Sequence, residues 1–304
     1  MDLKTAENGF GGVYSLLLTP YKEDLSVDYD LYAEYVRWQV SQGAQHLFSV
    51  CGSSEMAVLT LDERVKCASI AVKNSCGHKV IATANLEPAW EMQIEEIKRI
   101  EDTGVDAIIF VTKSYGNDDV RMVGYIEELA AHATKPVLVY EFPGYPNNKM
   151  SGTAYAQLVD DGAIVGVKDT TCLMEGGILD KIAVQGDSCV LQANIPYLLE
   201  AYEAGARGVI ATPSTCGVGI LRKMWDCFVN GDIDCARRYH ADVCSLSDVM
   251  DCGFCASAKY LVSLQGLPFL PVTREHAEKR INPQAYKNMR VWHDAAVRKG
   301  LMER

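Results

Sequence analysis

Short runs of apolar residues alternate along the chain with longer segments in which apolar residues recur every three or four positions. The short runs lack the polar alternation of a strand with one solvated face, so they are typical of strands covered on both faces. The longer segments have the period of amphipathic helices. Eight strands are predicted in this way, at 13–19, 46–50, 80–84, 107–111, 137–140, 164–168, 190–192 and 208–211.

Each predicted strand is followed by a predicted helix, and this alternation indicates the fold class. The helices are expected at 28–42, 61–76, 90–103, 118–133, 151–160, 173–184, 196–204 and 221–229, the sixth of them weakened by Gly176 and Gly177. Eight such units predict a (β/α)8 barrel over residues 1–230. Three further helices, at 235–249, 255–264 and 283–301, predict a helical C-terminal region over residues 231–304 that packs on the barrel.

A doubly wound nucleotide-binding sheet is the main alternative for a chain with this alternation. That fold carries a glycine-rich phosphate loop after its first strand. Here the first strand leads into Thr19-Pro20-Tyr21-Lys22, and neither G-x-G-x-x-G nor a P-loop is present. The pattern therefore favours the barrel.

Composition narrows the classes of partner. The 304-residue chain is 48% hydrophobic and 23% charged, as is normal for a globular enzyme. Its net charge of −11 argues against nucleic acid or an anionic membrane surface as a partner, because both require a basic face. No apolar run approaches the roughly 18 residues that span a membrane, and the first residues lack the apolar core of a signal peptide. We therefore expect a cytoplasmic protein.

The eleven cysteines are scattered through predicted strands and helices, which favours reduced thiols over a disulfide framework. One cluster has a second interpretation. Cys252 and Cys255 form a C-x-x-C, and His240 and Cys244 lie upstream at helical spacing, so the four could hold zinc. Because this spacing matches no common zinc motif, small helix-packing residues are the preferred interpretation and no metal is predicted.

Candidate chemistry lies where the strands end, because ligands bind at that edge of a barrel. Lys168 closes a run of small and apolar residues, so its stem is expected among apolar neighbours with its amine at the edge. Desolvation lowers the pKa of a lysine, and a neutral amine attacks a ketone to form a Schiff base. An ion pair with Asp169 or another carboxylate is the structural alternative.

Two other strand ends are chemically consistent with such a lysine. Tyr140 ends the adjacent strand, where its hydroxyl can carry protons. Gly52-Ser53-Ser54 follows the second strand and offers backbone N–H groups and two hydroxyls to a carboxylate. A packed barrel tyrosine and an ordinary turn with a helix cap are the structural alternatives. Taken with Lys168, these groups predict the binding of a 2-oxo acid.

Over nearly its whole length the chain resembles the dihydrodipicolinate synthase/N-acetylneuraminate lyase family of class I aldolases. The resemblance rests on the 28-residue step from Tyr140 to Lys168 and on the segments 18–20, 49–55, 80–82, 140–143 and 166–170. It implies a (β/α)8 barrel in which pyruvate, or the pyruvate half of a larger 2-oxo acid, is bound covalently to Lys168. It also implies that Tyr140 relays protons and that the Ser53 region binds the carboxylate. Tyr115 is implied to be catalytic as well: in a homotetramer or homodimer it would reach into the neighbouring subunit's site and complete a proton relay.

The serine loop departs from the family's usual Gly-Thr-Thr-Gly-Glu or Gly-Ser-Thr-Gly-Glu. Here it is Cys51-Gly52-Ser53-Ser54-Glu55. Aligned without a gap, Gly52 takes the first hydroxyl position and the proton relay loses a member. Shifted by one residue, Ser53 and Ser54 fill both hydroxyl positions.

Two departures concern the far end of the substrate. Dihydrodipicolinate synthases carry an arginine after the fifth strand for the carboxylate of the aldehyde, whereas the segment around Tyr145 has none and Lys149 is the nearest cation. Sialic acid lyases carry acidic residues after the seventh strand, whereas Gln192 and Asn194 are neutral. Tyr145, Gln192 and Asn194 are therefore predicted to determine specificity.

Together these features predict a class I lyase that cleaves or forms a carbon–carbon bond through a Lys168 imine. No metal or diffusible cofactor is expected, because the protonated imine is the electron sink. Within the family, 4-hydroxy-tetrahydrodipicolinate synthase and a 2-keto-3-deoxy-sugar-acid aldolase or dehydratase remain open. A non-catalytic 2-oxo-acid-binding homologue is the alternative of another class. A metal-dependent barrel is disfavoured because the strand ends offer Glu141 and Asp169 but no histidine.

Overall fold

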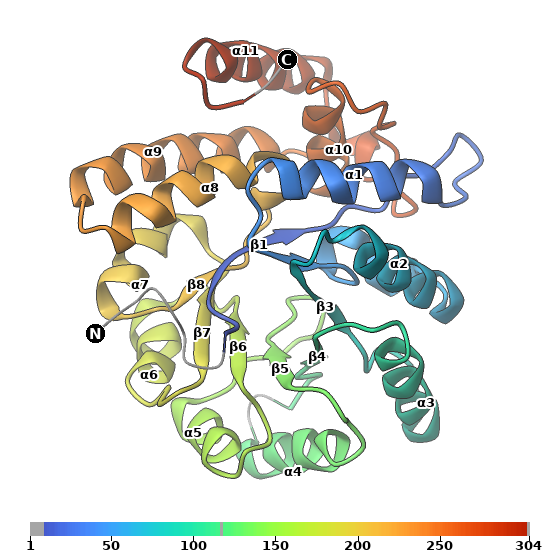
Figure 1. Cartoon of the computed structure of the whole chain (residues 1–304), viewed down its shortest axis with the longest axis vertical. Helices are drawn as coiled ribbons and strands as arrows, with labels where there is room; N and C mark the ends of the chain where they lie inside the picture. Colours follow the sequence, from blue (N-terminus) through green and yellow to red (C-terminus); the bar gives the residue numbers. More distant parts are fainter. Residues whose placement is uncertain (1–8, 116–117, 303–304) are drawn as a thin grey trace. The chain divides into compact units, whose positions relative to one another are not determined.

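The computed structural model describes residues 9–115 and 118–302. Eight parallel strands follow one another in chain order and form a closed barrel (Figure 1). The predicted fold class is thereby confirmed. The strands are β1 (Gly12–Leu16), β2 (His46–Phe48), β3 (Lys79–Thr83), β4 (Ala107–Val111), β5 (Val137–Tyr140), β6 (Gly166–Asp169), β7 (Cys189–Gln192) and β8 (Gly208–Val209).

Helices follow the strands as the apolar periodicity predicts. They are α1 (Tyr29–Ser41), α2 (Leu61–Asn74), α3 (Trp90–Glu101), α4 (Asp119–Ala130), α5 (Gly152–Asp160), α6 (Leu179–Ile182), α7 (Leu198–Ala204), α8 (Ser214–Val229), α9 (Ile233–Met250), α10 (Cys255–Ser263) and α11 (Pro283–Arg298).

Two helices differ from the prediction for local reasons. The sixth is reduced to four residues, because Gly176 adopts φ +64° and the segment Met174–Ile178 forms an irregular wide turn before α6 begins. The eighth begins at Ser214 rather than at 221. Its first turns are made of small residues and glycines, which carry no amphipathic signal.

Two compact units make up the chain, and each is described by itself. Unit 1 comprises Met1–Gly12 and Ile81–Ile210, and unit 2 comprises Val13–Val80 and Ala211–Arg304. The division into a barrel at 1–230 and a helical region at 231–304 stays a prediction.

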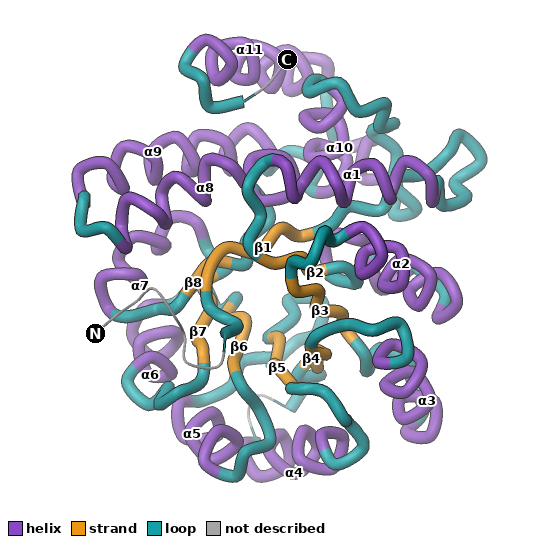
Figure 2. The backbone as a smooth tube through the Cα atoms, in the orientation of Figure 1, coloured by secondary structure: helices purple, strands orange, loops and turns teal. Residues whose placement is uncertain are grey.

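Unit 1 contains a continuous set of parallel strands from β4 to β7, which run side by side in Figure 2. Every residue of these strands is buried, including the charged and polar residues Lys168, Asp169 and Gln192 at the ends of β6 and β7. The strand register places Val111 beside Tyr140 and Tyr140 beside Lys168. The ends of three strands thus present their side chains in one row.

In unit 2, α8 and α9 pack side by side, and α11 packs on α9 (Figure 1). A disulfide between Cys227 and Cys235 joins the end of α8 to the start of α9. The expectation of reduced thiols throughout is therefore wrong for this pair. Within residues 9–115 and 118–302, no three His, Cys, Asp or Glu side chains are grouped to hold a metal ion, and no helix is long and apolar enough to cross a membrane.

Candidate functional site

Lys168 and Tyr140 are brought together in unit 1. They are direct partners across β5 and β6, and the Lys168 Nζ lies 4.0 Å from the centroid of the Tyr140 ring. Their exposed fractions are 3% and 4%. The predicted nucleophile and the predicted proton carrier therefore share one largely dehydrated environment at the carboxyl ends of adjacent strands.

The residues that follow them form a buried ionic cluster, which consists of Glu141, Asp169 and Lys181. Lys181 Nζ lies 2.9 Å from Glu141 Oε1 and 2.7 Å from Asp169 Oδ2, and the three side chains are at most 1% exposed. Because successive strand residues point to opposite faces, this cluster lies behind the row that contains Tyr140 and Lys168. No sequence pattern singles out Lys181, because it lies in the weakest predicted helix.

Charge in the ionic cluster is unbalanced, because two carboxylates share one ammonium. Burial raises the pKa of Glu141 to about 7, against the opposing attraction of Lys181. Burial alone would lower the pKa of Lys181, but the two carboxylates outweigh it and raise that pKa. Within the described chain, Glu141 Oε2 has no hydrogen-bond partner. Glu141 is thus the member of the cluster most ready to bind a proton.

Glu141 also anchors the loop that leads from β5 to α5. Its Oε1 accepts a hydrogen bond from the Met150 N–H at 2.6 Å. Its backbone carbonyl accepts one from Asn148 Nδ2 at 2.9 Å and another from the Thr170 hydroxyl. The segment 142–149, which carries Tyr145, begins directly after Glu141, and hydrogen bonds from Asn148 and Met150 hold its other end to the same residue.

Changing Glu141 to glutamine is expected to flatten the dependence of stability on pH. Because the folded pKa lies above the usual glutamate value, the folded state binds this proton more tightly, and wild-type stability falls as pH rises from about 4.5 to 7. The fall attributable to this group is at most roughly 3 kcal/mol. Urea unfolding at pH 5 and pH 8 measures it, with E200Q, a change at an exposed glutamate, as the control. Parallel curves for wild type and E141Q would contradict the assignment.

Gln192 and Asn194 lie at the same edge, where Asp169 and Gln192 are partners across β6 and β7. Gln192 is 1% exposed, and its Oε1 accepts a hydrogen bond from the Asn194 N–H at 2.8 Å. Asn194 Oδ1 accepts one from Cys172 Sγ at 2.8 Å. Both amides therefore fix the loop after β7, and their role in specificity stays a prediction.

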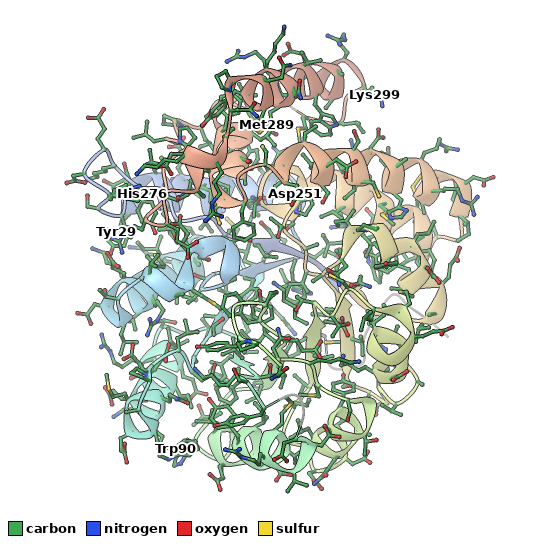
Figure 3. The ribbon with its side chains drawn as sticks, turned by 180° about the vertical axis from the view of Figure 1, so that it is seen from behind. Tyr29, Trp90, Asp251, His276, Met289 and Lys299 are labelled. Carbon is green, nitrogen blue, oxygen red and sulfur yellow. A yellow bond between two sulfur atoms is a disulfide. The ribbon has the colours of Figure 1, made fainter. Side chains whose placement is uncertain are left out.

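Tyr115 and Tyr145 line a cavity of about 430 Å³ in unit 1. The Tyr115 ring lies 5.2 Å from the ring of Tyr125, and the ring of Trp90, labelled in Figure 3, lies 6.2 Å from the Tyr125 ring. Lys113 Nζ lies 3.4 Å from the Tyr145 hydroxyl. No sequence motif singles out Lys113. The reach of Tyr115 into a neighbouring subunit stays a prediction.

The serine loop belongs to unit 2 and forms a short 3-10 turn, Gly52–Ser54. The Ser54 hydroxyl is engaged by backbone groups: the carbonyls of Leu17 and Ser49 are both acceptors for its single proton, and its oxygen accepts from the Cys51 N–H. The Ser53 hydroxyl, by contrast, is buried and has no hydrogen-bond partner among the described residues. Of the two predicted hydroxyls, Ser53 Oγ is thus the one available to a ligand.

Glu55 fixes the end of this loop. It adopts a left-handed backbone conformation with φ 58°. Its Oε1 lies 2.7 Å from Lys259 Nζ on α10, and its Oε2 accepts a hydrogen bond from the Arg274 N–H at 2.8 Å. Segments of the C-terminal part of the chain therefore hold the serine loop in place.

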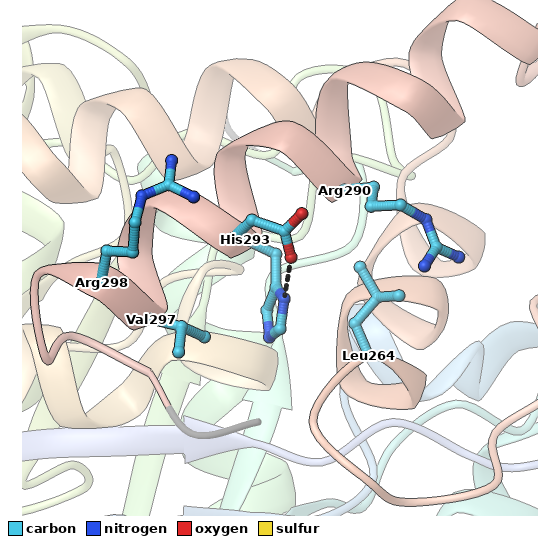
Figure 4. Close-up of a pocket in the computed structure, with 6 residues that line it drawn as sticks. Leu264, Arg290, His293, Val297 and Arg298 are labelled. Atoms are coloured by element: carbon cyan, nitrogen blue, oxygen red, sulfur yellow. Dashed lines mark ion pairs between the residues drawn. The ribbon is translucent and has the colours of Figure 1, made fainter.

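A separate cavity of about 390 Å³ lies in unit 2 beside α11 (Figure 4). It is lined by Leu264 and by α11 side chains, among which His293 Nδ1 lies 3.8 Å from Asp294 Oδ1. Arg290 and Arg298 lie on either side of His293. No strand end contributes to this cavity, so it is not a candidate for the predicted chemistry.

Comparisons with known proteins agree with this geometry. The family model described as the dihydrodipicolinate synthetase family matches residues 9–282. A 4-hydroxy-tetrahydrodipicolinate synthase from Magnetococcus marinus is 24% identical over 302 residues, 97% of this chain and 99% of the relative. An N-acetylneuraminate lyase from Rhizobium meliloti is 26% identical over 95% of this chain and 99% of the relative.

Solved structures share the fold. A prophage protein of the dihydrodipicolinic acid synthase family from E. coli K12, in complex with pyruvate, has a TM-score of 0.84 at 19% identity, over 96% of this chain and 99% of that one. Dihydrodipicolinate synthase from Aquifex aeolicus has a TM-score of 0.81 at 22% identity, over 97% and 100%. With the family model spanning nearly the whole length, the chain belongs to the dihydrodipicolinate synthetase family and is a lyase of the class I aldolase type.

Proposed function

We propose that this protein is a Schiff-base lyase that cleaves or forms a carbon–carbon bond in a 2-oxo acid, with the pyruvate half of the substrate joined to Lys168. The observation that carries the proposal is the contact between the Lys168 amine and the Tyr140 ring, 4.0 Å apart and both buried. Two neighbours of this kind provide a nucleophile and a proton carrier in one place.

In the cleavage direction the Lys168 amine attacks the C2 ketone, and loss of water gives the imine. The Tyr140 hydroxyl gives its proton to the departing water as the imine forms. The C3–C4 bond then breaks, its electron pair moves into the protonated imine, and the Tyr140 phenolate takes the proton of the C4 hydroxyl as the aldehyde leaves. The resulting enamine takes a proton at C3. Water hydrolyses the imine, so that pyruvate departs and the amine is restored.

Borohydride trapping tests this mechanism directly. With pyruvate present, reduction of the imine is expected to leave a stable carboxyethyl group on Lys168, which peptide mass spectrometry locates. Omission of pyruvate is the control. An intact enzyme that is inactivated without any adduct on Lys168, or that shows no adduct at all, would overturn the proposal and favour a 2-oxo-acid-binding homologue without catalysis.

We expect Ser53→Ala to weaken the binding of pyruvate and Ser54→Ala to weaken the fold. Removing the available Ser53 hydroxyl loses one hydrogen bond to a charged carboxylate, so the pyruvate concentration for half-maximal trapping rises about tenfold. Removing Ser54 Oγ leaves backbone groups unpaired and costs about 1–3 kcal/mol of stability. Trapping and thermal unfolding of both variants separate the two roles. Equal effects from both variants would contradict this division of roles.

The nature of the other half of the substrate remains part of the proposal. The segment around Tyr145 holds no arginine, which disfavours the carboxylated aldehyde of 4-hydroxy-tetrahydrodipicolinate synthesis. A 2-keto-3-deoxy sugar acid, cleaved or dehydrated through the same imine, fits the neutral Gln192 and Asn194. Assembly as a homodimer or homotetramer, cytoplasmic location and independence from a diffusible cofactor remain predictions of the sequence.

A further inference from the structure

The cavity beside Tyr145 has the size and position of a binding site for the far end of the substrate. It lies in unit 1 where the chain leaves β3, β4 and β5, and its volume of about 430 Å³ is within the range of small-molecule sites. Thr112 Oγ1 donates a hydrogen bond of 2.6 Å to the Asn148 carbonyl, which ties the segment after β4 to the loop after β5. The wall of the cavity is therefore built from fixed segments.

The polar groups of this cavity suit hydroxyls better than a second carboxylate. Lys113 and the Tyr145 hydroxyl donate hydrogen bonds, whereas the carboxylate of Glu87 accepts them. The positive and negative charges offset one another, so the cavity has no excess charge for an anion. Hydroxyl groups both donate and accept hydrogen bonds. The rings of Tyr115 and Tyr125 add apolar surface for the carbon atoms that carry these hydroxyls.

Strand register places this cavity at the same edge of the strands as Lys168. Val111, Tyr140 and Lys168 form one row across β4, β5 and β6, and neighbouring strands are about 4.8 Å apart, which puts β4 about 10 Å from β6. Lys113 lies two residues beyond Val111 on the same edge. A carbon chain that starts at the Lys168 amine and crosses this edge towards β4 is directed towards the segment that carries Lys113.

The backbone of Lys113 supports a functional role for its side chain. The residue adopts φ 53°, a left-handed conformation that costs a lysine free energy and that glycine would adopt without strain. A long cationic side chain is nevertheless held there, with its Nζ 5.1 Å from the centroid of the Tyr145 ring. The strained turn aims the ammonium at Tyr145.

From these observations we infer that Lys113, together with Tyr145, is a specificity-determining residue that binds the hydroxylated far end of a 2-oxo acid joined to Lys168. The inference rests on the proposed Schiff-base function. It adds to that function a residue, Lys113, that selects the far end of the substrate, called the tail, and it assigns hydroxyl groups to that tail.

Lys113→Met tests the inference through two substrates that differ in the tail. The probes are 2-oxo-3-deoxygluconate, which carries hydroxyls to its end, and 4-hydroxy-2-oxopentanoate, which ends in a methyl group. Loss of a charged hydrogen bond is expected to lower kcat/KM for the first probe about 10- to 100-fold. The second probe, and borohydride trapping of pyruvate on Lys168, should change less than about twofold. Lys113→Arg, which keeps the charge, should recover part of the loss, and Lys98→Met, a change at an exposed lysine on α3, is the control.

Other outcomes overturn the inference in distinguishable ways. Equal loss on both probes would show that Lys113 supports only the fold, and no loss on either would show that it does not contact the tail. A wild type that traps pyruvate but uses the hydroxylated probe no better than the short one would refute the subsite while leaving the Schiff-base function standing. A wild type that traps no pyruvate would refute the proposed function itself.

Discussion

Replacing Lys168 with methionine is expected to lower kcat at least about 10⁴-fold, the loss typical of removing a residue that forms the covalent intermediate. Methionine fills a similar volume but has no amine, so neither the imine nor its electron sink can form. The measurement is release of pyruvate from whichever 2-oxo acid the wild type cleaves. Because the row that contains Lys168 is buried, the thermal unfolding of K168M should be recorded beside the kinetics.

Lys168→Arg separates charge from chemistry at the same position. Arginine keeps a positive charge beside Tyr140 but does not form an imine. We expect it to be as inactive as the methionine variant. Substantial activity in K168R would show that Lys168 acts only through its charge, and the mechanism would then be wrong.

The second large effect is expected at Lys181, which carries no predicted chemistry. Changing it to methionine leaves Glu141 and Asp169 buried together without a counter-charge, and the loss of one partner from a buried ion pair costs about 3–5 kcal/mol. The free energy of unfolding, measured in urea at pH 8, should fall by this amount. The loss should be smaller at pH 5, because Glu141, with its pKa raised to about 7, is then protonated.

A triple variant tests whether unpaired charge is the cause. In E141Q/D169N/K181M all three groups are neutral and similar in size, and the amides keep the acceptors for Met150 and Thr171. Neutral replacement of a buried ionic cluster is often nearly harmless to stability, so most of the lost free energy should return. A triple variant as unstable as K181M would show that packing, rather than charge, causes the loss.

The sequence predicted the barrel well because its signal is local and repeated. Each of the eight strands is a short, mostly apolar run, and each run is matched to a helical period within about 30 residues. Prediction failed where glycine and small residues removed that signal, at the wide turn around Gly176 and at the start of α8. The shared partner of the buried carboxylates, Lys181, lies in the short helix α6 and was therefore not predicted.

The sequence predicted only those site residues that lie at the ends of predicted strands. Lys168 and Tyr140 lie beside one another because register aligns the ends of adjacent parallel strands. The distinction between Ser53 and Ser54 could not be predicted, since it depends on carbonyls of Leu17 and Ser49 that fold back onto one hydroxyl. Lys113 was missed because its significance lies in a backbone conformation and a contact with Tyr145, neither of which leaves a pattern in sequence.

The double anchoring of the segment 142–149 by Glu141 has a consequence for the evolution of this scaffold. Glu141 holds the C-terminal end of the segment through Asn148 and Met150, and its side chain points away from the row that contains Tyr140 and Lys168, so residues 145–147 can be exchanged without moving that row. Gly144 is different, because a Cβ there would meet the Phe142 ring, which packs on Tyr140. Libraries randomised at 145–147, with Glu141, Gly144 and Asn148 left intact, should therefore yield new aldehyde preferences at a higher rate than libraries that include any of these three residues. The loop that selects the aldehyde can therefore change in sequence while Tyr140 and Lys168, which carry out the bond cleavage, stay in place.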